Sequence, residues 1–134
     1  MRRIDRMTKA AVAALEDIKA RDIVVLNVTP MTSMFDRMVI ASADSARQTR
    51  ALANSVQEKL KSMGYGVQGT EGEQTAEWVL VDLGEVVVHI MQPAAREYYN
   101  LEELWGREPR TRAPRRAAAA VRGSEQRPKA EPRP

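Results

Sequence analysis

The chain has 134 residues, a formal net charge of +3 at pH 7 and a sequence pI of about 9.5. It contains no cysteine and a single histidine, His89. This composition excludes disulfides, thiolate metal sites and cysteine nucleophiles, and it nearly excludes a conventional zinc or non-haem iron site. We therefore expect one domain that uses no metal and no cofactor.

No stretch of the sequence has the hydrophobicity of a targeting or membrane-spanning segment. The first residues are basic, but no apolar run of signal-peptide length follows them. No segment approaches the roughly 20 consecutive apolar residues that span a bilayer. We expect a cytoplasmic protein that makes no membrane contact.

The charge is unevenly distributed along the chain. Residues 107–134 hold nine Arg or Lys residues, three Glu and five of the seven prolines, which gives a net charge of +6. The whole chain has 21 basic and 18 acidic residues, so 12 basic and 15 acidic residues remain in 1–106, a net charge of −3. We expect a folded domain over 1–106 and a disordered Arg/Pro/Ala-rich tail over 107–134. Such a tail either contacts RNA weakly through phosphate attraction or serves only as a solubilising extension.

The first half of the domain has the pattern of a helix, two strands and a second helix. Apolar residues at helical spacing predict an amphipathic helix over 5–20. The β-branched, apolar segment 22–28 predicts a buried strand, and 36–43 predicts a second strand. Ser45 and Gln48 fit a capping box at the start of a helix that ends at Gly64.

The second half predicts a hairpin and a short helix. The apolar segments 77–83 and 86–91 are joined by a very short turn, so they are expected to pair as antiparallel strands. Pro93 opens a last helix that continues through 101–105. The order α-β-β-α-β-β-α predicts an α/β domain, a compact mixed sheet with flanking helices.

A glycine pattern in the middle of the chain suggests nucleotide binding but has the wrong context. Residues 64–69 read GYGVQG, which matches G-x-G-x-x-G. That fingerprint requires a strand before it and a helix N-terminus after it, so that backbone N–H groups meet a pyrophosphate. Here a predicted helix precedes the glycines and an extended segment follows them. We interpret Gly64 as a helix C-cap and the others as loop glycines.

His89 allows two interpretations. Along its strand it shares one side with Val87 and Met91. A general base needs an orienting carboxylate, and Asp82 across the hairpin is a candidate, but no serine or threonine lies in an evident nucleophile context. A structural histidine, hydrogen-bonded to a neighbouring carboxylate or carbonyl, is the favoured interpretation.

The aromatic residues are clustered in the sequence. Four of the six lie within 28 residues: Trp78, Tyr98, Tyr99 and Trp105. Large rings usually fill a core. Trp, Tyr and Arg also dominate protein–protein hot spots, and Arg96 and Asp82 are close by in the sequence. Composition leaves core and interface as near-equal alternatives.

The segment 71–106 carries a specific motif, EGEQTAEWVLVDLGEVVVHIMQPAAREYYNLEELWG. Its characteristic positions are Glu71-Gly72, Trp78, Asp82, Gly84, Val88-His89, Arg96, Tyr99, Leu101-Glu102 and Leu104-Trp105. Further matches upstream are Asp22-Ile23, Ser33, Asp36, Ser45 and Arg47-Gln48. This pattern closely resembles the ribosomal silencing factor family, whose members are also called Iojap-like proteins. The resemblance covers roughly residues 5–106 and leaves 107–134 without a counterpart.

The resemblance implies a function that spacing alone does not show. Family members adopt a nucleotidyltransferase-like α/β fold, bind the large ribosomal subunit through ribosomal protein uL14 and sterically block joining of the small subunit. They thereby repress translation under nutrient limitation, and several form homodimers. None of this requires catalysis, so the resemblance implies a protein that is not an enzyme.

The same resemblance implies which residues form the protein-binding surface for the large-subunit partner. They are the motif residues Trp78, Asp82, Gly84, His89, Arg96, Tyr99, Leu101, Leu104 and Trp105. Two positions outside this block depart from the family pattern. Ala43 replaces a glycine found in many relatives, and Phe35 replaces a frequent threonine, so the departures bear on the loop and on any dimer surface.

Two other functions remain as alternatives. One is a large-subunit assembly factor with RNA contacts from the basic tail. The other is a degenerate nucleotidyltransferase-like nucleotide binder. Nucleotidyltransferase chemistry needs a Gly-Ser pair followed by paired carboxylates that hold magnesium, whereas residues 41–45 read ASADS and no second carboxylate follows.

Overall fold

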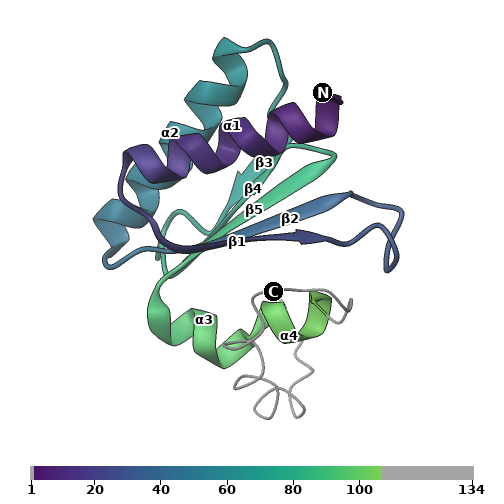
Figure 1. The fold of residues 1–134 in the computed structure, drawn as a ribbon. Coiled ribbons are helices and arrows are strands. Elements are labelled where there is room, and N and C mark those ends of the chain that lie inside the picture. The colour runs from purple at the N-terminus through teal and green to yellow at the C-terminus, as the bar shows by residue number, and fades with distance from the viewer. Residues whose placement is uncertain (1, 107–134) are drawn as a thin grey trace.

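The computed structural model describes residues 2–106, which form a five-stranded sheet with helices on both faces (Figure 1). The predicted tail, 107–134, lies outside the described residues. The elements are, in chain order, α1 (Arg3–Asp17), β1 (Arg21–Asn27), β2 (Arg37–Ser42), α2 (Ala46–Ser62), β3 (Gly69–Glu71), β4 (Trp78–Asp82), β5 (Val86–Met91), α3 (Pro93–Tyr99) and α4 (Leu101–Trp105). The prediction of a mixed α/β sheet flanked by helices is confirmed.

The sheet has the strand order β1-β2-β5-β4-β3. β2 and β5 run parallel at its centre, and every other neighbouring pair is antiparallel. The predicted hairpin is β4–β5, in which Leu80 lies opposite His89 and Trp78 lies opposite Met91. β5 is buried along its whole length, because it has a strand on each side and helices over both faces.

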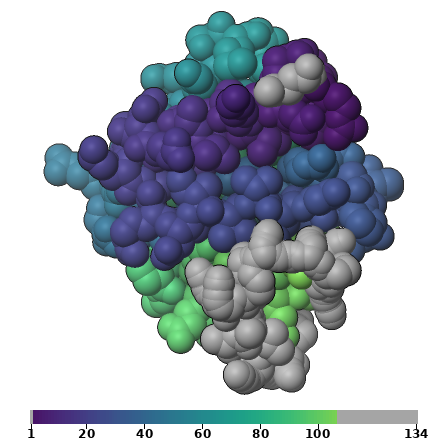
Figure 2. Space-filling view, viewed as in Figure 1, coloured from purple at the N-terminus to yellow at the C-terminus, as the bar shows by residue number. Residues whose placement is uncertain are grey.

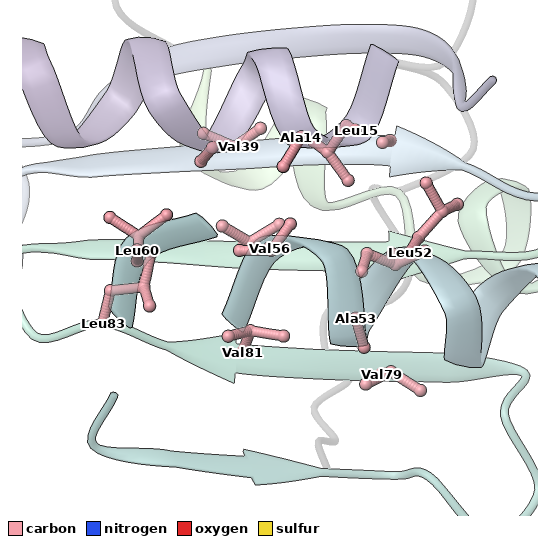
Figure 3. Packing of buried hydrophobic residues seen from close by; sticks show 14 of the residues in the cluster. Ala14, Leu15, Val39, Leu52, Ala53, Val56, Leu60, Val79, Val81 and Leu83 are labelled. Carbon is pink, nitrogen blue, oxygen red and sulfur yellow. The ribbon is translucent and has the colours of Figure 1, made fainter. Parts of the chain in front are cut away.

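The larger core lies between the sheet and the two long helices. Alternate residues of β5, Val86, Val88 and Ile90, point to this side, as strand periodicity requires. Figure 3 shows how α2 packs over β4 through the pairs Leu60 and Leu83, Val56 and Val81, and Ala53 and Val79. The predicted amphipathic faces of both long helices are therefore the faces that are buried.

A smaller apolar cluster lies on the other face of the sheet, under α3 and α4 (Figure 1). Its buried members are Val28, Met38, Ile40, Val87 and Met91. Partly buried aromatic residues from α3, α4 and β4 pack against them. The short helices thus cover only part of this face, and several of the residues that pack there remain partly exposed.

Both predicted ends of α2 are capped. The Ser45 hydroxyl accepts the backbone N–H of Gln48 at 3.0 Å. Gln48 does not complete the predicted capping box, because its side-chain oxygen accepts the N–H of Asp44 instead. Its amide group also donates to two carbonyls at the end of α1 and so ties the two helices together. At the other end Gly64 has φ +91° and lies in paired N–H bonds back to α2, a Schellman motif.

Three details of the sequence prediction were wrong. β1 is an edge strand with exposed positions along it, not a buried strand, and its side chains reach the surface between α1 and α3 (Figure 2). The segment 64–73 contains a short strand, β3, that was not predicted. The last helix is broken at Asn100, whose φ of +43° ends α3 and starts α4.

Within residues 2–106, no helix is both long enough and apolar enough to cross a membrane.

Gly72, in the turn between β3 and β4, is expected to be essential for stability. Its φ is +91°, and a Cβ added there would lie 2.1 Å from the carbonyl oxygen of Trp78. We predict that Gly72→Ala lowers the free energy of unfolding by about 2 kcal/mol or more, measured by denaturant titration. Gly66→Ala is the control, because a Cβ added at Gly66 would have no atom within 4 Å. Equal effects of both substitutions would contradict the steric explanation.

Candidate protein-docking site

The residues assigned to protein binding by the resemblance do not form one patch. Trp78 and His89 lie on the sheet face that is turned away from the long helices, and Tyr99 packs against this face from α3. Asp82 and Gly84 lie at the opposite end of β4 from Trp78, roughly 13 Å away at the usual strand rise of about 3.3 Å per residue. The structure therefore brings the aromatic residues together and leaves the hairpin turn apart from them.

Trp78, His89 and Tyr99 form the centre of this face. The indole N–H of Trp78 donates a hydrogen bond to Nδ1 of His89 at 2.9 Å. The ring of Tyr99 lies 4.6 Å from the ring of Trp78, at an interplanar angle of 45°. Trp78 is half-buried in this arrangement, so the hydrogen bond fixes the orientation of a ring that is still partly accessible.

His89 is a buried residue whose Nδ1 is held in a hydrogen bond. Only 9% of its surface is exposed, and burial lowers its pKa from the usual 6.5 to about 4. The ring is therefore neutral at pH 7, which Nδ1 requires in order to accept the indole N–H. The favoured interpretation expected a hydrogen bond with a carboxylate or carbonyl, whereas the partner is the indole of Trp78.

Asp82 does not orient the imidazole. Its Oδ1 accepts the backbone N–H of Gly84 at 2.9 Å and so closes the turn between β4 and β5. Gly84 has φ +93°, which a side-chain-bearing residue adopts only with strain. Both motif residues therefore shape the hairpin, which sets the register that pairs Leu80 with His89.

Arg96 holds α3 and α4 on the sheet. Two of its nitrogens donate to the two carboxylate oxygens of Glu102, each at 3.0 Å, and a third donates to the hydroxyl of Ser42 at 2.8 Å. The Arg96 side chain is only 11% exposed, so this bidentate pair is sheltered from water. Arg96 is thus a connection between β2, α3 and α4, and its charge is not free for a partner.

The α4 residues divide between packing and exposure. Leu101 and Trp105 pack on the smaller core, and the ring of Trp105 lies 5.6 Å from that of Phe35. Leu104 is 54% exposed. Phe35, one of the departures from the family pattern, is therefore a packing partner for a motif tryptophan.

A groove lies beside the Trp78 ring, with a volume of about 300 Å³. It is lined by residues of the β3–β4 region and of α3: Glu71, Gly72, Thr75, Glu77, Trp78, Leu80, Ala95 and Tyr99. Sequence reasoning did not assign Leu80 or Glu77 to the site. Leu80 is detectable in the sequence, because it lies two residues from Trp78 and so shares its face of the strand. Glu77 could not be recognised as a site residue from the sequence, because its position depends on how the turn after β3 folds.

Apolar and aromatic side chains make up most of this face. No group of three or more His, Cys, Asp or Glu side chains in residues 2–106 is arranged to hold a metal ion. The polar groups of the centre already bond to one another, and the aromatic and aliphatic surface around them is partly open. Tyr98, 77% exposed, extends this surface from α3 and packs edge-on against Tyr99.

The buried His89 makes a measurable pH prediction. The unfolded chain binds the imidazole proton near pH 6.5 and the folded protein binds it only near pH 4. The full stability contributed by neutral His89 is therefore present above pH 6.5 and is lost as the pH falls toward 4. Between pH 7 and 4.5 the wild type should lose about 2 to 3 kcal/mol more unfolding free energy than His89→Asn.

Asparagine is the substitution of choice, because its amide oxygen can accept the Trp78 indole N–H and does not titrate. Denaturant titrations of both proteins at the two pH values give the comparison. Carboxylates titrate in both proteins, so their contribution cancels. Parallel losses in the two proteins would show that His89 is not shielded from protonation.

The chain is similar to known proteins over nearly all of the described region. Residues 2–133 match the family model described as "Ribosomal silencing factor during starvation". A ribosomal silencing factor of Chromobacterium violaceum is 55% identical over 103 residues, which are 77% of this chain and 84% of that protein. That of Bacillus subtilis is 41% identical over 101 residues, 75% of this chain and 86% of that protein.

A mouse protein named "Mitochondrial assembly of ribosomal large subunit protein 1" is 36% identical over 97 residues, 70% of this chain and 42% of that protein. A crystal structure of a Chromobacterium violaceum protein superposes with a TM-score of 0.77 at 52% identity, and covers 84% of this chain and 93% of that one. The family match continues past residue 106, where the motif resemblance was expected to end. The chain belongs to the ribosomal silencing factor family.

Proposed function

We propose that this protein binds the large ribosomal subunit through ribosomal protein uL14 and sterically blocks joining of the small subunit, which represses translation when nutrients are limiting. The observation that carries the proposal is the half-open aromatic face around Trp78, in a chain that belongs to this family. Trp and Tyr rings held in fixed orientations are the residues that dominate protein–protein hot spots. We further propose that the protein acts in the cytoplasm.

The build of this face supports a docking role. Arg96 fixes α3 and α4 to β2, and His89 fixes the indole of Trp78, so few side chains need to be ordered on binding. Preordered side chains reduce the entropy cost of association. Apolar and aromatic surface at Tyr98, Leu104 and the groove is then available to a protein partner.

A steric mechanism requires no chemical reaction from the protein. The bulk of α1, α2 and the sheet lies behind the proposed docking face (Figure 1), so a docked molecule projects this bulk away from the large subunit. A second subunit that must occupy the same space is then excluded. No proton transfer is needed, which agrees with the hydrogen-bonded, neutral state of His89.

A role in large-subunit assembly is the second candidate. It is favoured by the name of the mouse relative, which concerns assembly of the mitochondrial large subunit. Weak rRNA contacts from the basic residues 107–134 would serve this role, and deletion of that segment would then abolish ribosome association. Homodimer formation is compatible with either role and is a separate proposal.

The proposal is tested by sedimentation with separated ribosomal subunits. We expect the protein to co-sediment with large subunits and not with small ones, and to lower the yield of joined ribosomes when small subunits are added. The acidic domain gives no reason for general RNA affinity. Equal binding to both subunits that is lost at moderate salt would instead indicate phosphate attraction and would refute the proposal.

A matched pair of exposed apolar residues locates the docking face. Tyr98 is 77% exposed on α3, and Met63 is 43% exposed at the end of α2, on the other side of the sheet. We predict that Tyr98→Ala weakens binding to large subunits about tenfold and leaves the melting temperature nearly unchanged. Met63→Ala should change neither quantity. The reverse pattern would place the docking face on the long helices.

A further inference from the structure

The groove beside Trp78 has a chemical character that the docking proposal does not use. Two glutamates, Glu71 from β3 and Glu77 before β4, line it together with the rings of Trp78 and Tyr99. Both glutamates are exposed, and neither side chain takes part in a hydrogen bond or an ion pair within residues 2–106. The groove therefore combines unpaired negative charge with aromatic walls.

No cation of the described chain neutralises this groove. Arg96, on α3, is committed to Glu102 and Ser42. Arg50 reaches the turn after β3 from α2, but it donates to the backbone carbonyls of Glu73 and Gln74. Glu71 and Glu77 thus have no cationic partner within residues 2–106.

The aromatic walls favour the same kind of ligand. The indole N–H of Trp78 is used by His89, so the ring lines the groove without a free donor and contributes aromatic surface to it. Tyr99 lies 4.6 Å from it and widens the electron-rich wall. Cations bind over such faces, and carboxylates add directed acceptors for N–H groups. An anionic group would be repelled, and an aliphatic one would leave the carboxylates without a partner.

We propose that this groove binds an arginine side chain of the protein on which the domain docks. A guanidinium suits it better than an ammonium, because a planar cation stacks on a ring while its edge donates to a carboxylate. The inference rests on the proposed docking function and specifies which residue of the partner is bound: the partner surface presents an exposed arginine opposite Trp78. Glu71 and Glu77 select this partner by charge, and the rings select its shape.

The subsite can be tested without ribosomes, on the full-length protein. The chain has two tryptophans, so its ¹⁵N spectrum contains two indole N–H signals, and Trp105 serves as the internal reference. Titration with N-acetyl-arginine methylamide should shift the Trp78 signal selectively. The citrulline analogue, which has nearly the same shape and no charge, should not shift it. An equal response to both probes, or no response to the arginine probe, overturns the proposal.

Paired substitutions then test the carboxylates. Glu71→Gln combined with Glu77→Gln should abolish the arginine response and weaken binding to large subunits about tenfold. The control is Glu16→Gln combined with Glu58→Gln, which removes the same net charge from exposed glutamates on α1 and α2. The control should behave as wild type. Equal loss of binding to large subunits in both double variants would show that the effect comes from overall charge and would refute a specific subsite.

The outcomes separate the subsite from the docking function. If wild type fails to sediment with large subunits, the proposed function is wrong, and the arginine titration still decides the chemistry of the groove. If wild type sediments and the Glu71/Glu77 double variant binds equally well, docking stands and the arginine subsite is wrong.

A competing source of arginine is this chain's own segment 107–134, which contains eight. Replacing all eight with glutamine in the full-length protein tests it. The probe response should remain unchanged. If the probe gains access only after this replacement, the groove belongs to the chain's own segment, and the assignment to a partner is wrong.

Discussion

The ion pair between Arg96 and Glu102, together with the hydrogen bond from Arg96 to Ser42, holds α3 and α4 on the second face of the sheet. α3 and α4 have seven and five residues, too short to be stable on their own, and no residue in either helix is fully buried. Their position depends on side-chain contacts with the sheet. A sheltered bidentate pair supplies direction as well as energy, which apolar packing of such short helices does not. The aromatic surface around Trp78 depends on that placement, because Tyr99 belongs to α3.

Trp78 shows why core and interface were not true alternatives. The ring packs on the smaller core and donates to a buried histidine, yet it remains partly exposed beside the groove. Loss of its N–H would leave Nδ1 of His89 buried without a donor, which costs roughly 1 to 3 kcal/mol. Loss of its ring would remove a wall of the groove. Under the proposed docking role, substitutions at Trp78 should therefore combine a stability effect with a binding effect, whereas Tyr98 should isolate the binding effect.

Sequence reasoning succeeded where the determining physics was local. Helical spacing, the Ser45 cap, the Gly64 terminus and the β4–β5 turn each depend on residues a few positions apart, and each was predicted correctly. It failed where the answer depended on topology. β1 has the apolar composition of a central strand, but only the strand order shows it at the edge. The sequence pointed to Asp82 or a carbonyl as the partner of His89, and only the strand register places the Trp78 indole against Nδ1. The resemblance pointed to the motif residues, but Leu80 and Glu77, which line the same groove, were not assigned, and the contacts of Arg96 and Asp82 became clear only from the structure.

The charge of the proposed docking face bears on the kind of surface it selects. A large ribosomal subunit is covered mainly by RNA phosphates, which attract basic proteins with little regard to sequence. Residues 1–106 carry a net charge of −3, and within residues 2–106 no cation is paired with Glu71 or Glu77 in the groove. Under the proposed docking role, RNA phosphate would be repelled by these carboxylates and would add little favourable contact there. Binding energy would then come from protein surface that offers apolar contact to the rings and positive charge to the carboxylates. Such repulsion would direct the docking face to a protein patch and away from most of the particle.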